Sequence, residues 1–152
     1  MIRLSAKNIS RCYFLNKKSL KKIVSTVFKY LGINNAGLSI AFTTDREIRR
    51  LNLLYRNTAR PTDVLAFSMS EGKRLKSDSL ILGDIAISVD RAKRQAEIFK
   101  TTFKNEILLY IVHGILHLIG YDDETPHQKK RMRRKENEIL SMLLRRKWQR
   151  AN

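Results

Sequence analysis

Residues 110–127 read YIVHGILHLIGYDDETPH and contain all three histidines of the chain, His113, His117 and His127. His113 and His117 lie four residues apart in an apolar run, so they share one face of a predicted helix at 103–118. Neutral imidazoles at this spacing are a common way to present two ligands to a divalent metal. Two histidines on one face favour a metal site over the alternative, which is a pair of ordinary core histidines.

Catalytic zinc sites usually have three protein ligands and one open position, so a third ligand is expected here. Gly120 can adopt a left-handed conformation, which would turn the chain back beneath the helix end. Asp123 is then the first candidate for the third ligand, and His127 in the next helix is the second. Asp122 and Glu124 are candidates for accepting a hydrogen bond from a ligand imidazole.

The residue after His113 is Gly114. Zinc peptidases that carry an HExxH helix have a glutamate at this position, where it acts as general base. The sequence HGILH therefore argues against peptide hydrolysis by the usual route. A glycine beside the ligand also lets a substrate or another backbone approach closely.

Positive charge is concentrated at the two ends of the chain. The 152 residues include 31 Lys and Arg against 14 Asp and Glu, which gives a net charge of +17. Residues 1–44 hold eight basic side chains and no acidic ones, and residues 126–152 hold ten against two. Such ends favour a polyanionic partner, and their apolar periodicity favours nucleic acid over a membrane surface.

The composition fits one cytoplasmic domain. The single cysteine, Cys12, excludes an internal disulfide and fits a reducing compartment. No signal peptide is visible, and the longest apolar stretch, 107–119, is interrupted by two histidines. We expect a single domain over residues 1–152, with basic N- and C-terminal segments.

Hydrophobic periodicity predicts strands at 2–7, 38–43, 64–69 and 80–89, and helices at 17–31, 44–55, 90–100, 103–118 and 125–148. In this reading Asp90 caps the third helix, and Thr125 and Pro126 begin the last one. The order predicts an α+β fold, with a small four-stranded mixed sheet packed with about five helices.

Three segments together carry a family resemblance. HGILHLIGYD at 113–122 resembles the signature HGxLHLxGYDH, LNLLYRNTARPTDVLAFSM at 51–69 is similar to LNxxYRxxxxPTDVLSFxF, and LGDIAISVDRAKRQAE at 82–97 is similar to LGDIxIsxexaxxQAe. These are the motifs of the YbeY family, bacterial metal-dependent endoribonucleases of rRNA maturation. The three segments occur in the family order and at the family spacing.

The resemblance implies a zincin-like helix, one Zn2+ ion held by three histidines, and cleavage of single-stranded RNA. It also implies a role in small-subunit rRNA 3′-end maturation and ribosome quality control. Carried over, it makes His113 and His117 metal ligands and Arg56 the essential arginine. The third family histidine aligns with Asp123, a harder ligand, so another divalent metal is an alternative to zinc.

The residues around these motifs allow a mechanism to be outlined. Arg56 suits the stabilisation of the negative charge that gathers in phosphodiester cleavage. Asp63 and Asp84 are candidates for orienting Arg56 or a ligand histidine. The sequence leaves two alternatives for the nucleophile: water activated by the metal, or the 2′-hydroxyl of the RNA.

The partners expected are single-stranded rRNA and the small ribosomal subunit, with ribosome-associated proteins as further candidates. The predicted contact with RNA is a basic cluster that follows the metal segment: Lys129, Lys130, Arg131, Arg133 and Arg134. Two alternatives remain. One is a non-catalytic RNA-binding assembly factor with a structural metal, and the other is a metallopeptidase.

Overall fold

The computed structural model describes residues 2–56, 63–69 and 80–148. Within these ranges it contains four strands and five α-helices, so the predicted α+β architecture is confirmed. The elements are β1 (Arg3–Lys7), α1 (Lys17–Tyr30), β2 (Ala36–Thr43), α2 (Asp45–Arg56), β3 (Val64–Ser68), β4 (Leu80–Ser88), α3 (Val89–Ile98), α4 (Phe103–Leu118) and α5 (Pro126–Leu144), with a short 3-10 helix at Ile9–Arg11.

The strands form one mixed sheet in the order β1-β2-β4-β3. β1, β2 and β4 are parallel, and β3 pairs with β4 in the antiparallel direction at one edge. Parallel neighbours need a crossover connection, and α1 supplies the one between β1 and β2. Side chains alternate between the two faces along each strand, so β2 directs Leu38, Ile40 and Phe42 into the main core.

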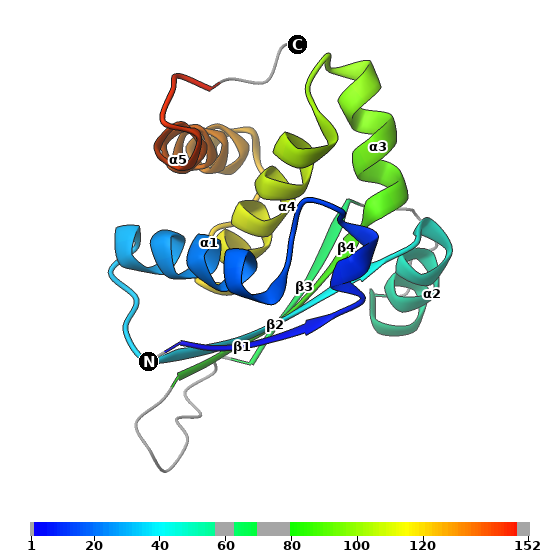
Figure 1. The fold of residues 1–152 in the computed structure, drawn as a ribbon, viewed down its shortest axis with the longest axis horizontal. Coiled ribbons are helices and arrows are strands. Elements are labelled where there is room, and N and C mark those ends of the chain that lie inside the picture. Colours follow the sequence, from blue (N-terminus) through cyan, green and yellow to red (C-terminus); the bar gives the residue numbers. More distant parts are fainter. Residues whose placement is uncertain (1, 57–62, 70–79, 149–152) are drawn as a thin grey trace.

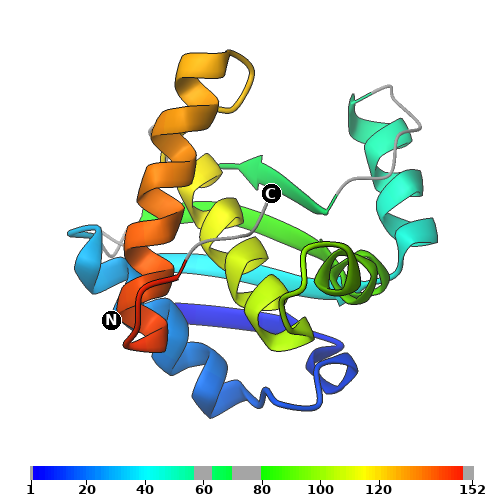
Figure 2. The ribbon, with the colours of Figure 1, turned by 90° about the horizontal axis from the view of Figure 1, so that it is seen from above.

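Four helices cover one face of the sheet, and α2 packs against the other (Figures 1 and 2). α4 crosses the middle of the covered face, with α1, α3 and α5 around it. The alternation along β4 separates the two layers. Ile85 and Ile87 belong to the main core, whereas Ala86 packs with Ile48 of α2 on the opposite face.

Every residue of α4 from Asn105 to Leu118 is buried except His113 and His117. A helix that is apolar on all sides is typical of a protein core. About a quarter of each imidazole side chain is exposed, 27% for His113 and 25% for His117. Among the described residues, the two candidate ligands are therefore the part of α4 between Asn105 and Leu118 that is open to solvent. No helix of the described ranges has the length and hydropathy needed to cross a bilayer.

The predicted start of α3 is wrong. The helix begins at Val89, and its N-cap is Ser88, whose hydroxyl accepts a hydrogen bond from the Arg91 amide (3.1 Å). Asp90, the predicted cap, accepts a hydrogen bond from the amide of Asp45 at the start of α2 (3.0 Å). The aspartate thus serves the N-terminus of a neighbouring helix, which favours negative charge.

The predicted end of α5 is also wrong. The helix ends at Leu144, because Arg145 adopts a left-handed conformation with φ 52°. After this turn the backbone N–H of Trp148 donates to the hydroxyl of Ser141 (3.0 Å). The chain therefore folds back along α5, and Trp148 is buried against it.

Cys12 lies in the main core with no exposed surface. Burial raises the pKa of its thiol from 9.0 to about 12, although the positive charge of Lys93 opposes the shift. We expect the native protein to react very slowly with a thiol reagent at mildly alkaline pH, and the unfolded chain to react fast. The absorbance of released thionitrobenzoate measures both rates. Rapid labelling of the native protein would show that Cys12 is accessible.

Candidate metal centre

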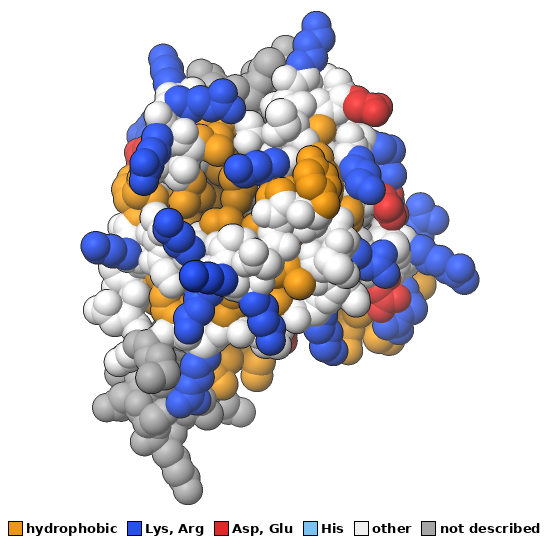
Figure 3. Space-filling model, in the orientation of Figure 1, with side chains coloured by type: hydrophobic (Ala, Val, Ile, Leu, Met, Phe, Trp, Pro, Cys, Tyr) orange, Lys and Arg blue, Asp and Glu red, His pale blue; other side chains and the backbone are white. Residues whose placement is uncertain are grey.

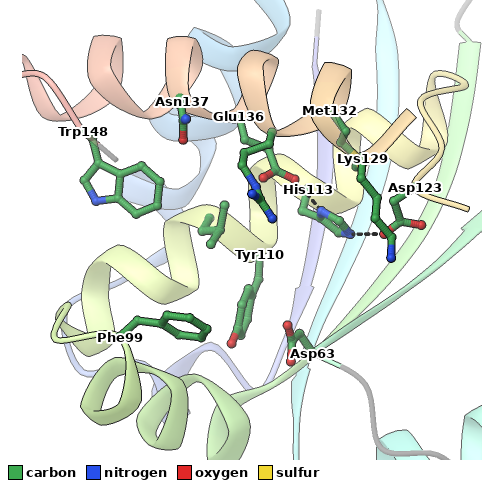
Figure 4. A pocket seen from close by; sticks show the side chains of 12 residues that line it. Asp63, Phe99, Tyr110, His113, Asp123, Lys129, Met132, Glu136, Asn137 and Trp148 are labelled. Carbon is green, nitrogen blue, oxygen red and sulfur yellow. Dashed lines mark hydrogen bonds and ion pairs between the residues drawn. The ribbon is translucent and has the colours of Figure 1, made fainter. Parts of the chain in front are cut away.

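The structure brings His113, His117 and Asp123 together. Nε2 of His113 and Nε2 of His117 are 3.0 Å apart, and Oδ2 of Asp123 is 3.7 Å from the first and 3.6 Å from the second. The ligand atoms of these three residues form a group that could hold a metal ion. Figure 4 shows His113 between Asp123 on one side and Glu136 on the other.

The turn after α4 places Asp123. Gly120 has φ 103°, a conformation that side chains with a Cβ rarely adopt. Its N–H bonds to the carbonyl of His117 (3.1 Å). The N–H of Tyr121 bonds to the carbonyl of Leu116 (3.0 Å). These two bonds make a Schellman motif, which ends the helix and reverses the chain. The turn predicted at Gly120 is confirmed.

The three donor atoms fit a divalent transition-metal ion. Metal–ligand bonds of about 2.0–2.1 Å in tetrahedral geometry place donors about 3.3–3.4 Å apart, close to the observed separations of 3.0, 3.6 and 3.7 Å. Two imidazole nitrogens and one carboxylate oxygen are a zinc-binding set that leaves one position open. The carboxylate oxygen is also suited to harder divalent ions, so the donor set alone does not select zinc.

Glu136 of α5 supports His113 from the side away from Asp123. The Nδ1–H of His113 donates to Oε1 of Glu136 at 2.5 Å, which directs Nε2 toward the other ligands. Burial of the imidazole lowers its pKa, but the hydrogen bond and charge of Glu136, with two more distant carboxylates, outweigh burial and raise the pKa. The surroundings of His113 therefore favour positive charge, which a divalent ion supplies.

Glu136 is not among the site residues predicted above, although the sequence contains a signal for it. Met132 and Ile139 are apolar residues seven positions apart on α5, and both are buried. Position 136 is four residues after the first and three before the second, so it lies on the same side of the helix. A carboxylate on the buried side of a helix needs a partner. The side chain of Glu136 is indeed only 13% exposed and is bound to His113.

We expect Glu136→Gln to weaken metal binding by about 10- to 100-fold, the usual cost of losing a carboxylate behind a ligand histidine. The amide cannot provide the negative charge that stabilises the metal-bound imidazole. Competition with a chromophoric chelator measures the metal affinity. Glu138→Gln is the matched control, because Glu138 is exposed and binds Tyr30 and Lys135. Equal affinities in the two variants would show that Glu136 has no role at the centre.

The alternative third ligand is not brought to the cluster. His127 lies in the first turn of α5, as predicted, but its side chain is exposed, and the candidate metal group in the described residues does not include it. Asp122 and Glu124 are exposed as well. One of these two carboxylates was predicted to accept a hydrogen bond from a ligand imidazole. For His113, the carboxylate that does so is Glu136.

The other predicted site residues are placed as follows. The carboxylate of Asp63 lies near enough to raise the pKa of His113, and it binds the guanidinium of Arg91. Asp84 is exposed on β4. Arg56 is the last residue of α2, and its side chain lies outside the described part of the structure. Its role as the essential arginine stays a prediction.

The five basic residues predicted to contact RNA do not share one face of α5. Lys129 and Arg133, four residues apart, line a cleft beside the candidate metal centre. Arg131 lies on another side of the helix, with its guanidinium 5.0 Å from the centroid of a tyrosine ring. Lys130 and Arg134 are exposed and do not line the cleft.

The cleft itself has a volume of about 390 Å³ and lies between α4, α5 and the end of α3. Figure 4 shows His113 and Asp123 at one end of it, and Phe99 and Trp148 at the other. The candidate metal centre thus opens into a cleft that continues well beyond the ligands.

Comparisons with known proteins agree on one family. The sequence model described as Endoribonuclease YbeY matches residues 5–144. The endoribonuclease YbeY of Aquifex aeolicus is 42% identical over 130 residues, which are 85% of this chain and 85% of that protein. The endoribonuclease YbeY of Geobacter metallireducens is 35% identical over 144 residues, 93% of this chain and 96% of the other. The solution structure of TM1509 from Thermotoga maritima is similar with a TM-score of 0.57 and 27% identity, over 95% of this chain and 92% of that one.

Proposed function

The chain belongs to the endoribonuclease YbeY family, and we propose that it is a zinc-dependent endoribonuclease specific for single-stranded RNA. The proposal includes a cytoplasmic role in 3′-end maturation of small-subunit rRNA and in ribosome quality control. Single-stranded rRNA and the small ribosomal subunit are then its partners. The family assignment itself makes the chain a hydrolase of RNA, and the metal, the strand preference and the ribosomal role are proposed here.

One observation carries the proposal: the donors of His113, His117 and Asp123 converge at the end of a cleft lined by basic residues of α5. A divalent ion held there supplies Lewis acidity, which polarises a phosphoryl oxygen and makes a water molecule more acidic. Glu136 holds the ring of His113 in the orientation needed for binding the ion.

Arg56 is proposed to stabilise the negative charge that develops on the phosphorus-bound oxygens, a task suited to a planar, permanently charged donor. The nucleophile is either water or the 2′-hydroxyl of the adjacent ribose. The ends of the products distinguish the two, because a 2′,3′-cyclic phosphate arises only from attack by the 2′-hydroxyl.

The test uses His113→Ala and Arg56→Ala, each assayed for RNA cleavage and for RNA binding. Both variants should lose cleavage by at least about 100-fold, while binding through the basic surface persists. Elemental analysis should show a loss of bound zinc in His113→Ala alone. Cleavage that survives in both variants, with binding intact, would instead favour a non-catalytic assembly factor with a structural metal.

A specific contact argues against the metallopeptidase alternative. Gly114 faces the sheet, and a Cβ built there would lie 2.8 Å from Cγ2 and Cδ1 of Ile85. This position has no room for the glutamate that acts as general base in HExxH peptidases. The close approach at Gly114 is therefore made by the side chain of Ile85 in β4, and not by the substrate or second backbone that was predicted.

The charge on the surface supports a polyanionic partner. Figure 3 shows Lys and Arg side chains spread over one face of the molecule, with few acidic side chains among them. With a net charge of +17, the molecule attracts a phosphate backbone over long range. Binding should therefore weaken as salt is raised.

The positions of Arg133 and Arg134 give a sharper expectation. A plot of log affinity for single-stranded RNA against log salt has a negative slope. Arg133→Gln should make this slope less negative by about 0.7, the value for one phosphate contact. Arg134→Gln removes the same charge outside the cleft and should change the slope less. Fluorescence anisotropy with a labelled oligonucleotide at several salt concentrations provides both slopes. Indistinguishable slopes would mean that the cleft side of α5 is not a preferred path for RNA.

A further inference from the structure

The far end of the cleft is built differently from the metal end. Phe99 comes from the C-terminus of α3, Leu109 from α4 and Trp148 from the segment after α5. Together they make an apolar wall with two aromatic rings. Asn137 of α5 is a polar side chain directed toward this space in Figure 4.

This end of the cleft is a specific construction of the chain. Trp148 reaches it only because α5 stops at Leu144 and Arg145 turns the chain back. Trp148 is 7% exposed, so its ring forms part of a wall and is not a free surface side chain. Phe99 and Asn137 are both partly exposed and can be contacted by a ligand.

The two ends are close enough to serve one substrate. Leu109 precedes His113 by one helical turn, a rise of roughly 5–6 Å along α4. Lys129 and Arg133 line the cleft as well and supply positive charge. The volume of about 390 Å³ falls within the range of about 300–1,000 Å³ typical of small-ligand pockets.

We propose that the far end of the cleft binds the base of a nucleotide next to the phosphodiester that is cleaved. The inference rests on the proposed endoribonuclease function. Phe99 and Trp148 provide flat apolar surfaces for a base, and such packing tolerates every base because each has a π-face. The amide of Asn137 has both a donor and an acceptor for a base edge. The carboxylates nearby do not oppose this, since Glu136 binds His113 and Asp63 binds Arg91.

A binding experiment isolates the contribution of the base. The metal-loaded, full-length protein is titrated with adenosine 5′-monophosphate and with ribose 5-phosphate by calorimetry. Trp148, the single tryptophan of the chain, reports on the same titrations by fluorescence. We expect the nucleotide to bind about 5- to 150-fold more tightly, the range found for stacking one base on a protein side chain, and to alter the fluorescence. Equal affinities would overturn the proposal, because they would show a site for phosphate only.

Variants locate the site. Phe99→Ala and Asn137→Ala should each reduce the advantage of the nucleotide over ribose 5-phosphate. Ile98→Ala is the matched control, because Ile98 is next to Phe99 in sequence, is 67% exposed and does not line the cleft. If Phe99→Ala fails to fold, Asn137→Ala still tests the site. If that variant binds the nucleotide more tightly than ribose 5-phosphate by the same factor as the unaltered protein, the site is refuted.

Cleavage of abasic substrates links the site to the reaction. A series of single-stranded RNAs, each lacking one base near the cleaved bond, should contain one position at which kcat/KM falls by about 5- to 150-fold. In Asn137→Ala, removal of the base at that position should lower kcat/KM by a smaller factor. Nucleotide binding without any RNA cleavage would refute the proposed function, and the far end of the cleft would then be a base-binding site with no cleaved bond beside it. Cleavage that is insensitive to every abasic position would refute the base site and leave the function standing.

Discussion

Asp123→Ala is expected to lose its bound metal, with affinity falling by more than about 100-fold, beyond the usual effect of losing a residue behind a ligand. Removal of the carboxylate leaves two imidazoles on one helix, which is one donor short of a catalytic zinc site. RNA cleavage should fall with it. The measurements are zinc content by elemental analysis and affinity by competition with a chelator, each independent of activity.

Two further variants make the experiment decisive. His127→Ala should keep full metal affinity, because His127 is exposed in the first turn of α5. Asp123→His replaces the carboxylate with an imidazole at the same position and should retain the metal. Normal zinc binding in Asp123→Ala, together with a loss in His127→Ala, would reassign the third ligand to His127.

The core of this centre could be predicted from the sequence because its signals are local. A spacing of four residues on a helix and a glycine at the helix end bring His113, His117 and Asp123 together with no information about the rest of the fold. Glu136 depends on how α5 packs against α4. That contact is tertiary, and the periodicity of α5 could show only that position 136 faces inward.

The difference between local signals and tertiary contacts also explains which parts of the fold could be predicted. The α4 boundaries were predicted as observed, because a long apolar run leaves little choice. The strand order β1-β2-β4-β3 could not be derived from periodicity, which says which residues are buried but not which strands pair. The start of α3 and the end of α5 were wrong for local reasons. Ser88 competed with Asp90 as a cap, and Arg145 adopts a left-handed turn more typical of glycine.

Gly83→Ala should produce the largest loss of stability, more than about 3 kcal/mol in the free energy of unfolding. Gly83 has φ 144°, and a Cβ there would lie 2.1 Å from the backbone carbonyl oxygen of Phe67 in β3. A backbone atom cannot change rotamer, so the two strands would have to separate. The same Cβ would lie 3.0 Å from Cδ2 of Leu118 at the end of α4. Urea unfolding followed by circular dichroism measures the loss.

Gly83→Ala is destabilising for two reasons, the positive φ of the backbone and the clash of the added Cβ with β3. Gly32→Ala separates them. Gly32 also has a positive φ, 71°, but a Cβ there would meet no atom within 4 Å. Its substitution should therefore cost only the backbone strain, about 1–2 kcal/mol. The difference between the two variants in the free energy of unfolding then reports on how closely β3 approaches β4 beneath α4. Because Leu118 follows directly after His117, folded Gly83→Ala protein should also bind metal less tightly than Gly32→Ala. Equal stabilities of the two variants would contradict this strand pairing and the position of α4 that depends on it.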